Sequence, residues 1–216
     1  FGNVWIISEK KCYLRHCLRR IRLHGKSGNK KSLLLNKILI EMKNIRLSKS
    51  CIGQEEIDAV TDVLKREYLG MGQDVYRFES ELTEFFGRNV TLVNTGTAAL
   101  HLAVQGAGVK EGDEVLVQSL TYVACFQAIR ATGGVPIACE VRKDDLTIDL
   151  EDAERKITDR TKAIMPVHYA GNPGDLDAIY EFAKKYNLRV IEDASHAFGT
   201  TYKGRRIGSF GDICCF

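Results

Sequence analysis

Apolar residues at helical spacing open the regularly patterned part of the chain. In residues 54–66 they fall on one face of a helix, at Ile57, Val60, Val63 and Leu64. In residues 75–86 they recur at that spacing, at Val75, Phe78, Leu82, Phe85 and Phe86, and Gly87 follows as a typical helix stop. Two amphipathic helices are therefore predicted at the start of the domain.

Beyond residue 90, short apolar runs alternate with helical segments. The predicted strands are residues 90–93, 114–118, 135–139, 163–167, 189–192 and 212–216. The predicted helices between them are residues 97–105, 122–131, 150–156 and 175–186. This alternation is typical of a mainly parallel sheet covered by helices on both faces, so the pattern predicts an α/β fold.

Polar residues follow several of these strands, at the edge of the sheet where open α/β proteins bind their ligands. After the first strand, Gly96 and Thr97 open a helix whose free amides could hold a phosphate. The alternative is an ordinary helix cap by Thr95 or Thr97. After the second strand, the ring of Tyr122 could stack on a flat heterocycle or could pack into the core.

Two further strand ends carry histidine and a carboxylate. His168 could contact a substrate or could hydrogen-bond to loop carbonyls. Asp193 and His196 lie three residues apart, and their alternative is a capping aspartate and a surface histidine. Taken together, an anion site, an aromatic ring, a carboxylate and an imidazole suit a phosphorylated aromatic cofactor. A carboxylate keeps a pyridine nitrogen protonated, which is the chemistry of pyridoxal phosphate.

The composition is that of a globular protein with no membrane segment. The chain has 216 residues, of which 44% are hydrophobic and 27% charged. No apolar run approaches the roughly 18 residues that a membrane helix needs. The seven cysteines follow no regular spacing, so we expect reduced thiols in a cytoplasmic protein and no zinc or other metal site.

The net charge of +3 is the sum of two different segments. Residues 1–41 carry ten Lys and Arg against two acidic residues, a balance of +8, and the remainder has 21 against 26, a balance of −5. Such asymmetry can indicate a targeting peptide or an arm that binds nucleic acid. Domain-like patterning begins only at Met42, so we expect residues 1–41 to lie outside the domain. We therefore do not expect the protein to function by binding nucleic acid.

Five motifs give the chain a specific resemblance. They read NTGTAALHLAV, EGDEVLVQSLTYVA, GGVPIACEV, ITDRTKAIMPVHYAG and VIEDASHAFGTTYKGRRIGSFGD. With them, the chain from about Ile45 to Phe216 resembles the DegT/DnrJ/EryC1/StrS family of pyridoxal-phosphate-dependent sugar aminotransferases. The resemblance implies the large domain of the fold type I transferases, with residues 42–216 as an N-terminal and cofactor-binding domain. It also implies a homodimer that moves an amino group from glutamate to a nucleotide-linked keto-sugar, for polysaccharide or amino-sugar biosynthesis.

The same resemblance gives roles to single residues. Gly96 and Thr97 hold the phosphate of pyridoxal 5′-phosphate, and Tyr122 stacks on its ring. Asp193 pairs with the pyridine nitrogen, and His196 stands near the oxygen side of the ring, where the family usually has Gln or His. The motif VHYAG differs from the more usual VHLYG, which leaves Tyr169 without a role carried over from the family.

The Schiff-base lysine of the family is expected a few residues beyond Phe216. Lys203 lies in the turn TYKGRR and is not expected to replace it. Because the last predicted strand runs to Phe216, we expect a fragment that lacks this lysine and the small domain and is inactive alone. One alternative is a dehydratase on the same scaffold, with histidine in place of the lysine. Another is a non-catalytic regulatory protein, suggested by the basic segment. A nicotinamide dehydrogenase is disfavoured, because no GxGxxG follows the first strand.

Overall fold

The computed structural model describes residues 5–8 and 50–216. It divides the chain into two compact units, one formed by Phe1–Glu9 with Met71–Phe216 and the other by Lys10–Gly70. Helix α2 (Gln54–Lys65) is the regular element described in the second unit. The amide of Gly53 donates to Glu56 Oε2 at 2.6 Å, which closes the first turn. None of the residues of α2 is buried, so its predicted apolar face is exposed.

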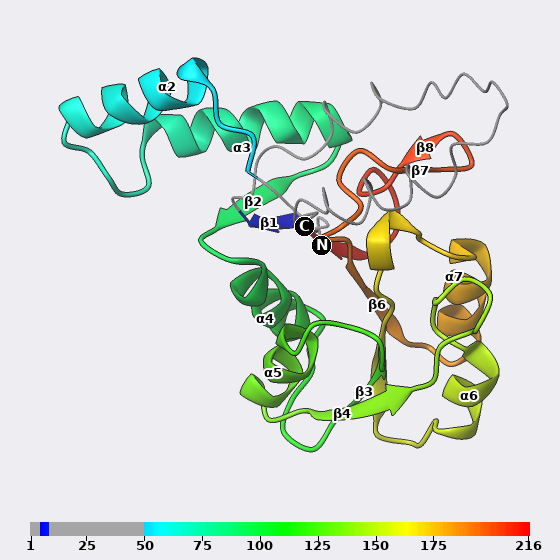
Figure 1. Cartoon of the computed structure of the whole chain (residues 1–216). Coiled ribbons are helices and arrows are strands. Elements are labelled where there is room, and N and C mark those ends of the chain that lie inside the picture. Colours follow the sequence, from blue (N-terminus) through cyan, green and yellow to red (C-terminus); the bar gives the residue numbers. More distant parts are fainter. Residues whose placement is uncertain (1–4, 9–49) are drawn as a thin grey trace, which may run out of the picture. The chain divides into compact units, whose positions relative to one another are not determined.

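Seven strands form one sheet in the other unit (Figure 1). In chain order they are β1 (Trp5–Ser8), β2 (Val90–Val93), β3 (Glu114–Gln118), β4 (Val135–Cys139), β5 (Thr161–Met165), β6 (Arg189–Asp193) and β9 (Ile213–Cys215). Their order across the sheet is β2-β1-β9-β6-β5-β3-β4, and every pair of neighbours is parallel. The prediction of a mainly parallel sheet is confirmed.

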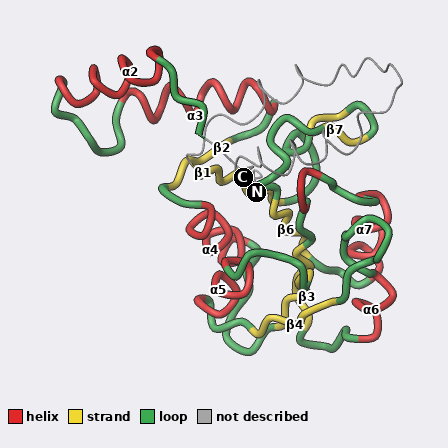
Figure 2. Tube along the Cα trace, in the orientation of Figure 1, coloured by secondary structure: helices red, strands yellow, loops and turns green. Residues whose placement is uncertain are grey.

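Helices cover both faces of this sheet, as the alternation of apolar runs predicted. Helices α4 (Gly96–Gly106) and α5 (Ala124–Ala131) lie on one face, and α3 (Gln73–Phe86), α6 (Leu150–Arg155) and α7 (Leu176–Lys185) pack on the other (Figures 1 and 2). Alternate residues of each strand join different cores: Val115 packs with α4 and α5, whereas Leu116 packs with α6 and α7. Strand β3 is thus buried on both sides, which explains its continuous apolar run.

Short side-chain caps fix the beginnings of the helices on the second face. Asp149 Oδ1 accepts from the Glu151 amide at 2.9 Å and begins α6, and Asp175 Oδ1 accepts from the Ala178 amide at 3.1 Å and begins α7. Helix α3 ends at Gly87, whose φ of 66° requires the left-handed region. These helix ends confirm the sequence-based boundaries to within two residues.

Three short strands were not predicted from the sequence. Strands β7 (Thr201–Tyr202) and β8 (Arg205–Arg206) form a small antiparallel hairpin with Lys203 and Gly204 in its turn. Strand β1 comes from the basic segment and pairs with β2 through four residues and with β9 through one. The rest of residues 1–41 and the expected boundary at Met42 lie outside the described residues, so the prediction that this segment is not part of the domain stays a prediction.

Candidate functional site

Asp193 is the last residue of strand β6, and its carboxylate accepts three hydrogen bonds. Its Oδ1 accepts from the Ser195 amide at 3.1 Å and from the Ser195 hydroxyl at 2.6 Å. Its Oδ2 accepts from the thiol of Cys125 at 3.1 Å. The residue is 6% exposed. A carboxylate has about four lone-pair positions, so these bonds fix its plane and leave it able to accept one more donor from the strand-end side.

The beginning of helix α4 offers amides to an anion. Thr95 caps the helix, and its Oγ1 accepts from the Ala98 amide at 3.0 Å. The amides of Gly96 and Thr97 belong to the first turn and have no partner inside the helix. Gly96 is half-buried and Thr97 is exposed. Helix α4 begins directly after the carboxyl end of β2, and β2 and β6 run parallel in one sheet, so this helix end lies at the same edge as Asp193.

Tyr122 lies between β3 and α5 and presents its ring to solvent. The side chain is 75% exposed, so the alternative that it packs into the core does not hold. Its carbonyl accepts from the Cys125 amide at 3.2 Å, which ties the tyrosine to the first turn of α5. An exposed ring on a fixed backbone is suited to stacking on a flat ligand.

His196 connects two strand ends. Its Nδ1 accepts from the amide of Ala170, in the 3-10 turn Tyr169–Gly171 after β5, at 3.3 Å. Its ring meets the ring of Tyr169 edge to face, with centroids 6.1 Å apart. Since Nδ1 accepts, the neutral imidazole carries its proton on Nε2, which is left to donate to a ligand. The side chain is exposed, as a ligand contact requires.

The amide of His168 donates to the Asp193 carbonyl at 2.9 Å, but its side chain lies with Glu192 and away from these residues. It is 1% exposed, and its Nε2 donates to Glu192 Oε2 at 2.8 Å. Glu192 Oε1 also accepts from the Tyr180 hydroxyl at 2.5 Å, and burial beside this carboxylate raises the pKa of Tyr180. Glu192 and Asp193 are neighbours in a strand and point to opposite faces. His168 therefore belongs to a buried polar cluster on the α7 face and gives no support to a direct substrate contact.

Two contacts of Asp193 went unrecognised in the sequence. Ser195 stands in the same motif, and its closeness to Asp193 was the available signal. Cys125 lies 68 residues away in sequence, and nothing in its local pattern indicates the contact. A strand-end rule finds the carboxylate, but only the packing of α5 on the sheet shows which side chain supports it.

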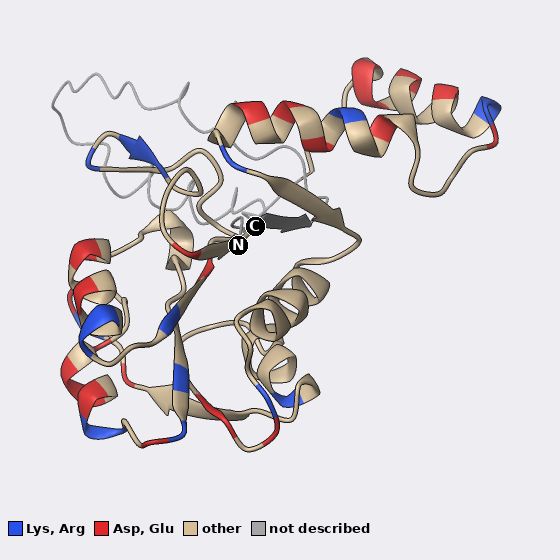
Figure 3. Ribbon diagram, turned by 180° about the vertical axis from the view of Figure 1, so that it is seen from behind, with Lys and Arg blue, Asp and Glu red and all other residues tan. Residues whose placement is uncertain are grey.

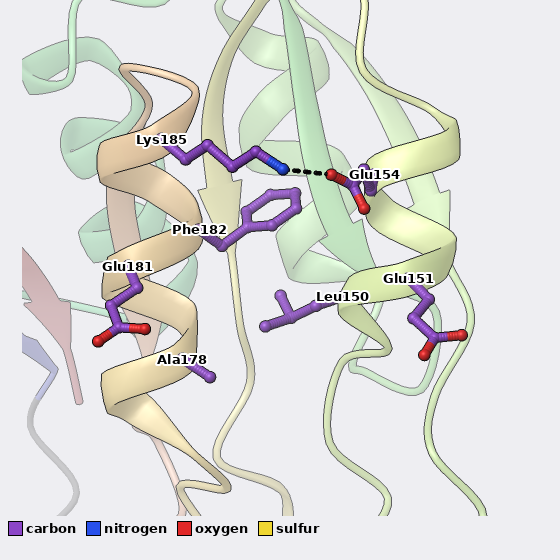
Figure 4. A pocket seen from close by; sticks show the side chains of 7 residues that line it. All are labelled: Leu150, Glu151, Glu154, Ala178, Glu181, Phe182 and Lys185. Atoms are coloured by element: carbon purple, nitrogen blue, oxygen red, sulfur yellow. Dashed lines mark hydrogen bonds and ion pairs between the residues drawn. The ribbon is translucent and has the colours of Figure 1, made fainter.

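A pocket elsewhere in the fold does not contain the predicted residues. It lies between α6 and α7 (Figure 4), with an apolar floor and a charged rim, and is lined by Leu150, Glu151, Glu154, Ala178, Glu181, Phe182 and Lys185. Lys185 Nζ pairs with Glu154 Oε1 across it at 2.6 Å. Leu150 and Phe182 pack with the core on the α7 face, so this pocket is not on the face of Asp193 and Cys125.

Comparisons with known proteins show the family to which the chain is similar. A family model described as the DegT/DnrJ/EryC1/StrS aminotransferase family matches residues 50–216. The spore coat polysaccharide biosynthesis protein SpsC of Bacillus subtilis (strain 168) is 43% identical over 166 residues, which are 76% of this chain and 43% of SpsC. The GDP-perosamine synthase of Escherichia coli O157:H7 is 41% identical over 177 residues, 81% of this chain and 49% of that enzyme. The chain thus spans less than half the length of these relatives.

Solved structures share the fold. DesV of S. venezuelae is 38% identical with a TM-score of 0.68, over 74% of this chain and 44% of DesV. The PLP form of Spr1654 from Streptococcus pneumoniae, named as a sugar aminotransferase, is 30% identical with a TM-score of 0.71, over 79% of this chain and 48% of its own. The predicted fold class, the large domain of a PLP-dependent transferase of fold type I, is confirmed.

The donor set suits pyridoxal phosphate rather than a metal. Amides at a helix end could bind a phosphate, an exposed aromatic ring could stack on a flat ring, and a supported carboxylate could accept a hydrogen bond from a ring nitrogen. Within residues 5–8 and 50–216, no group of histidine, cysteine and acidic side chains is arranged to hold a metal ion. None of the helices described there combines the length and the apolar character that a membrane span needs.

Proposed function

Because the chain belongs to the DegT/DnrJ/EryC1/StrS aminotransferase family, we propose that it supplies the cofactor-binding half of an enzyme that transfers an amino group from glutamate to a nucleotide-linked keto-sugar. The cofactor is pyridoxal 5′-phosphate. Its ring supplies an acceptor for the electrons of a bound amine when the ring nitrogen is protonated. The relatives named for perosamine and for spore coat polysaccharide support a role in polysaccharide or amino-sugar biosynthesis.

The observation that carries this proposal is the carboxylate of Asp193. Donors on both oxygens hold its plane. An ionised carboxylate at hydrogen-bond distance from a pyridine nitrogen keeps the proton on that nitrogen. Asp193 is the last residue of β6, and its Oδ2 has one donor, the Cys125 thiol, so this oxygen keeps a lone pair for a ligand lying over the end of β6.

The remaining residues bind and orient. The amides of Gly96 and Thr97, with the Thr97 hydroxyl, bind the phosphate at the positive end of α4. The ring of Tyr122 covers one side of the cofactor and excludes water from it. His196 donates from Nε2 to an oxygen substituent. His168 takes no part in binding, since its ring is closed off from solvent.

We further propose that residues 1–216 bind the cofactor reversibly and do not complete the reaction alone. Among the described residues, none of the hydrogen bonds of Asp193 and His196 involves a lysine. Lys203, the last lysine in the sequence, pairs with Asp177 at the beginning of α7. We propose that the lysine that forms the Schiff base lies in a region equivalent to the part of the relatives that residues 1–216 do not match.

A homodimer is proposed for the complete enzyme. Helix α4 carries no charged residue, whereas α6 and α7 are rich in them (Figure 3). Leu102 of α4 is 43% exposed, and an exposed helix face without charges is typical of the core of an interface.

A cytoplasmic location is also proposed. The five cysteines in the described part of the chain are unpaired, which supports a reducing compartment.

Cofactor binding gives the first test. Residues 1–216 are titrated with pyridoxal 5′-phosphate and binding is followed by absorbance. Asp193→Asn is expected to raise Kd by about tenfold or more, because a hydrogen bond to a charged group is lost. His196→Gln keeps a donor and is expected to change Kd by less than about threefold. Asp177→Asn, on the surface, is the control, and an Asp193→Asn variant that matched it would contradict the proposal.

Amino transfer is tested on the longest protein that the gene encodes. It is incubated with nitrogen-15-labelled glutamate and a panel of nucleotide-linked keto-sugars, and mass spectrometry detects the label in the sugar. Label in at least one sugar nucleotide is expected. A protein that binds the cofactor but labels none of the panel would contradict the proposed substrate class.

A further inference from the structure

We infer that Cys125 is a positioning residue of the proposed site, whose thiol orients the Asp193 carboxylate toward the nitrogen of the cofactor ring. The inference rests on the proposed function, because it concerns how the same carboxylate is held. Cys125 lies in the first turn of α5, fully buried, with Sγ 3.1 Å from Asp193 Oδ2. Among the described residues, the Cys125 thiol is the side chain that donates to Asp193 Oδ2, whereas the amide and the hydroxyl of Ser195 donate to Oδ1.

The donors and acceptors in the two hydrogen bonds of the Cys125 sulfur can be assigned from the Asp193 carboxylate. An ionised carboxylate can only accept, so the S–H of Cys125 points at Asp193. The hydroxyl of Thr121 lies 3.0 Å from the same sulfur and must then donate to it. Thr121, Cys125 and Asp193 form a chain in which each donor points toward the carboxylate and strengthens the next bond.

Cys125 acts here as a donor and not as a nucleophile. Burial raises the pKa of its thiol well above the usual range, and the charge of Asp193 raises it further. The thiolate, which is the reactive form, is therefore suppressed. The proton stays on sulfur throughout the physiological range of pH, so Asp193 keeps this donor in every state of the reaction.

The same turn also carries the stacking residue. The amide of Cys125 donates to the carbonyl of Tyr122 at 3.2 Å, so both residues belong to one hydrogen-bonded turn. The hydrogen bond from the thiol to Asp193 holds this turn against β6 and so helps to set the position of the Tyr122 ring relative to the carboxylate. A substitution that removes the thiol should disturb both the plane of the carboxylate and its basicity, because Oδ2 then lacks a donor.

The experiment compares three substitutions in residues 1–216 with pyridoxal 5′-phosphate as the probe. Cys125→Ala removes the thiol that donates to Asp193, and Cys125→Ser replaces it with a hydroxyl donor on a shorter bond. Thr121→Val removes the hydroxyl that donates to the sulfur and leaves the cysteine unchanged. Cys139→Ala is the matched control, since Cys139 is a fully buried cysteine whose sulfur lies near the Ile137 carbonyl at 3.6 Å. Circular dichroism checks the fold of each variant.

Two quantities are measured, Kd by absorbance and the nitrogen-15 resonance of the ring nitrogen in labelled cofactor. Cys125→Ala is expected to raise Kd by about fivefold, the effect of one net hydrogen bond. It should also move the resonance toward unprotonated pyridine, because a carboxylate with fewer donors competes better for the proton. Cys125→Ser should stay within about twofold of the parent, and Thr121→Val should fall between them. A purely structural role for Cys125 would not move the resonance in a folded variant.

The outcomes separate this inference from the function on which it rests. If the parent binds and Asp193→Asn weakens binding, but Cys125→Ala matches Cys139→Ala in both measurements, the role of Cys125 is refuted and the function stands. If Cys125→Ala does not fold, Thr121→Val decides, and a parent-like resonance in it refutes the donor chain. If the parent binds no cofactor, the proposed function and this inference fail together.

Discussion

Replacing His168 by leucine is expected to destabilise the protein strongly, because it strands a buried carboxylate. The side chains of His168 and Glu192 are 0% and 1% exposed, and the atoms that join them, Nε2 and Oε2, are 2.8 Å apart. Leucine has nearly the volume of histidine but cannot donate, so Glu192 keeps only the hydroxyl of Tyr180. Removing one partner of a buried pair typically costs about 3–5 kcal/mol.

The size of this effect can be measured by thermal unfolding and by urea. For a chain of this length, about 1 kcal/mol corresponds to roughly 2–4 °C in Tm. His168→Leu should therefore lower Tm by about 6–20 °C. Lys185→Met is the control, because Lys185 and Glu154 form an exposed pair with side chains 62% and 48% exposed. An exposed ion pair adds little to stability, so the Tm of this variant should equal that of the parent protein.

A double variant tests the reasoning itself. His168→Leu combined with Glu192→Met removes both members of the pair and leaves no stranded charge. Its loss of stability should be smaller than the sum of the two single losses by about 0.5–3 kcal/mol. Strict additivity, or a His168→Leu variant as stable as Lys185→Met, would refute the claim that burial and pairing determine the effect.

Two further predictions concern other parts of the fold. Asp152 has a pKa lowered to about 2, first by the hydrogen bond from Lys156. It therefore contributes stability above its unfolded pKa of about 3.9, and Asp152→Asn should lower the urea midpoint at pH 7 by an amount that disappears as the pH falls toward 2. Gly211 has φ +87° and a Cβ there would collide with the Tyr180 hydroxyl, whereas Gly204, at φ +77°, faces open space. Gly211→Ala should thus lower Tm more than Gly204→Ala does.

The sequence predicts the central part of the fold well because burial on both sides of a strand leaves a continuous apolar run. Strand β3, buried at every position, has the predicted bounds for this reason. Helix beginnings could be predicted where a capping side chain stands, as at Asp149 and Asp175. The hairpin β7–β8 could not, since strands of two residues have no measurable period.

The site could be predicted as far as chain connectivity determines it. Parallel strands carry Asp193, Tyr122 and Gly96 to one edge whatever the details of packing. His168 shows the limit, because whether a strand-end side chain faces a ligand or the core depends on the face to which it points. The resemblance and the strand-end rule both leave that open, and contact with Glu192 determines it.

Strand β1 comes from the basic segment that the charge pattern places outside the domain, and a proline at Ile6 distinguishes the two interpretations. β1 lies between β2 and β9, and Ile6 is paired with Thr91 on one side and Cys215 on the other. Proline removes a ladder hydrogen bond and is tolerated in sheets essentially only at edges. Ile6→Pro should therefore lower Tm, whereas Ile52→Pro, at an exposed position outside the helices and strands, should not. A Tm unchanged by Ile6→Pro would mean that the sheet does not depend on β1 and would support the boundary at Met42, because a domain that begins at Met42 loses nothing when this strand is broken.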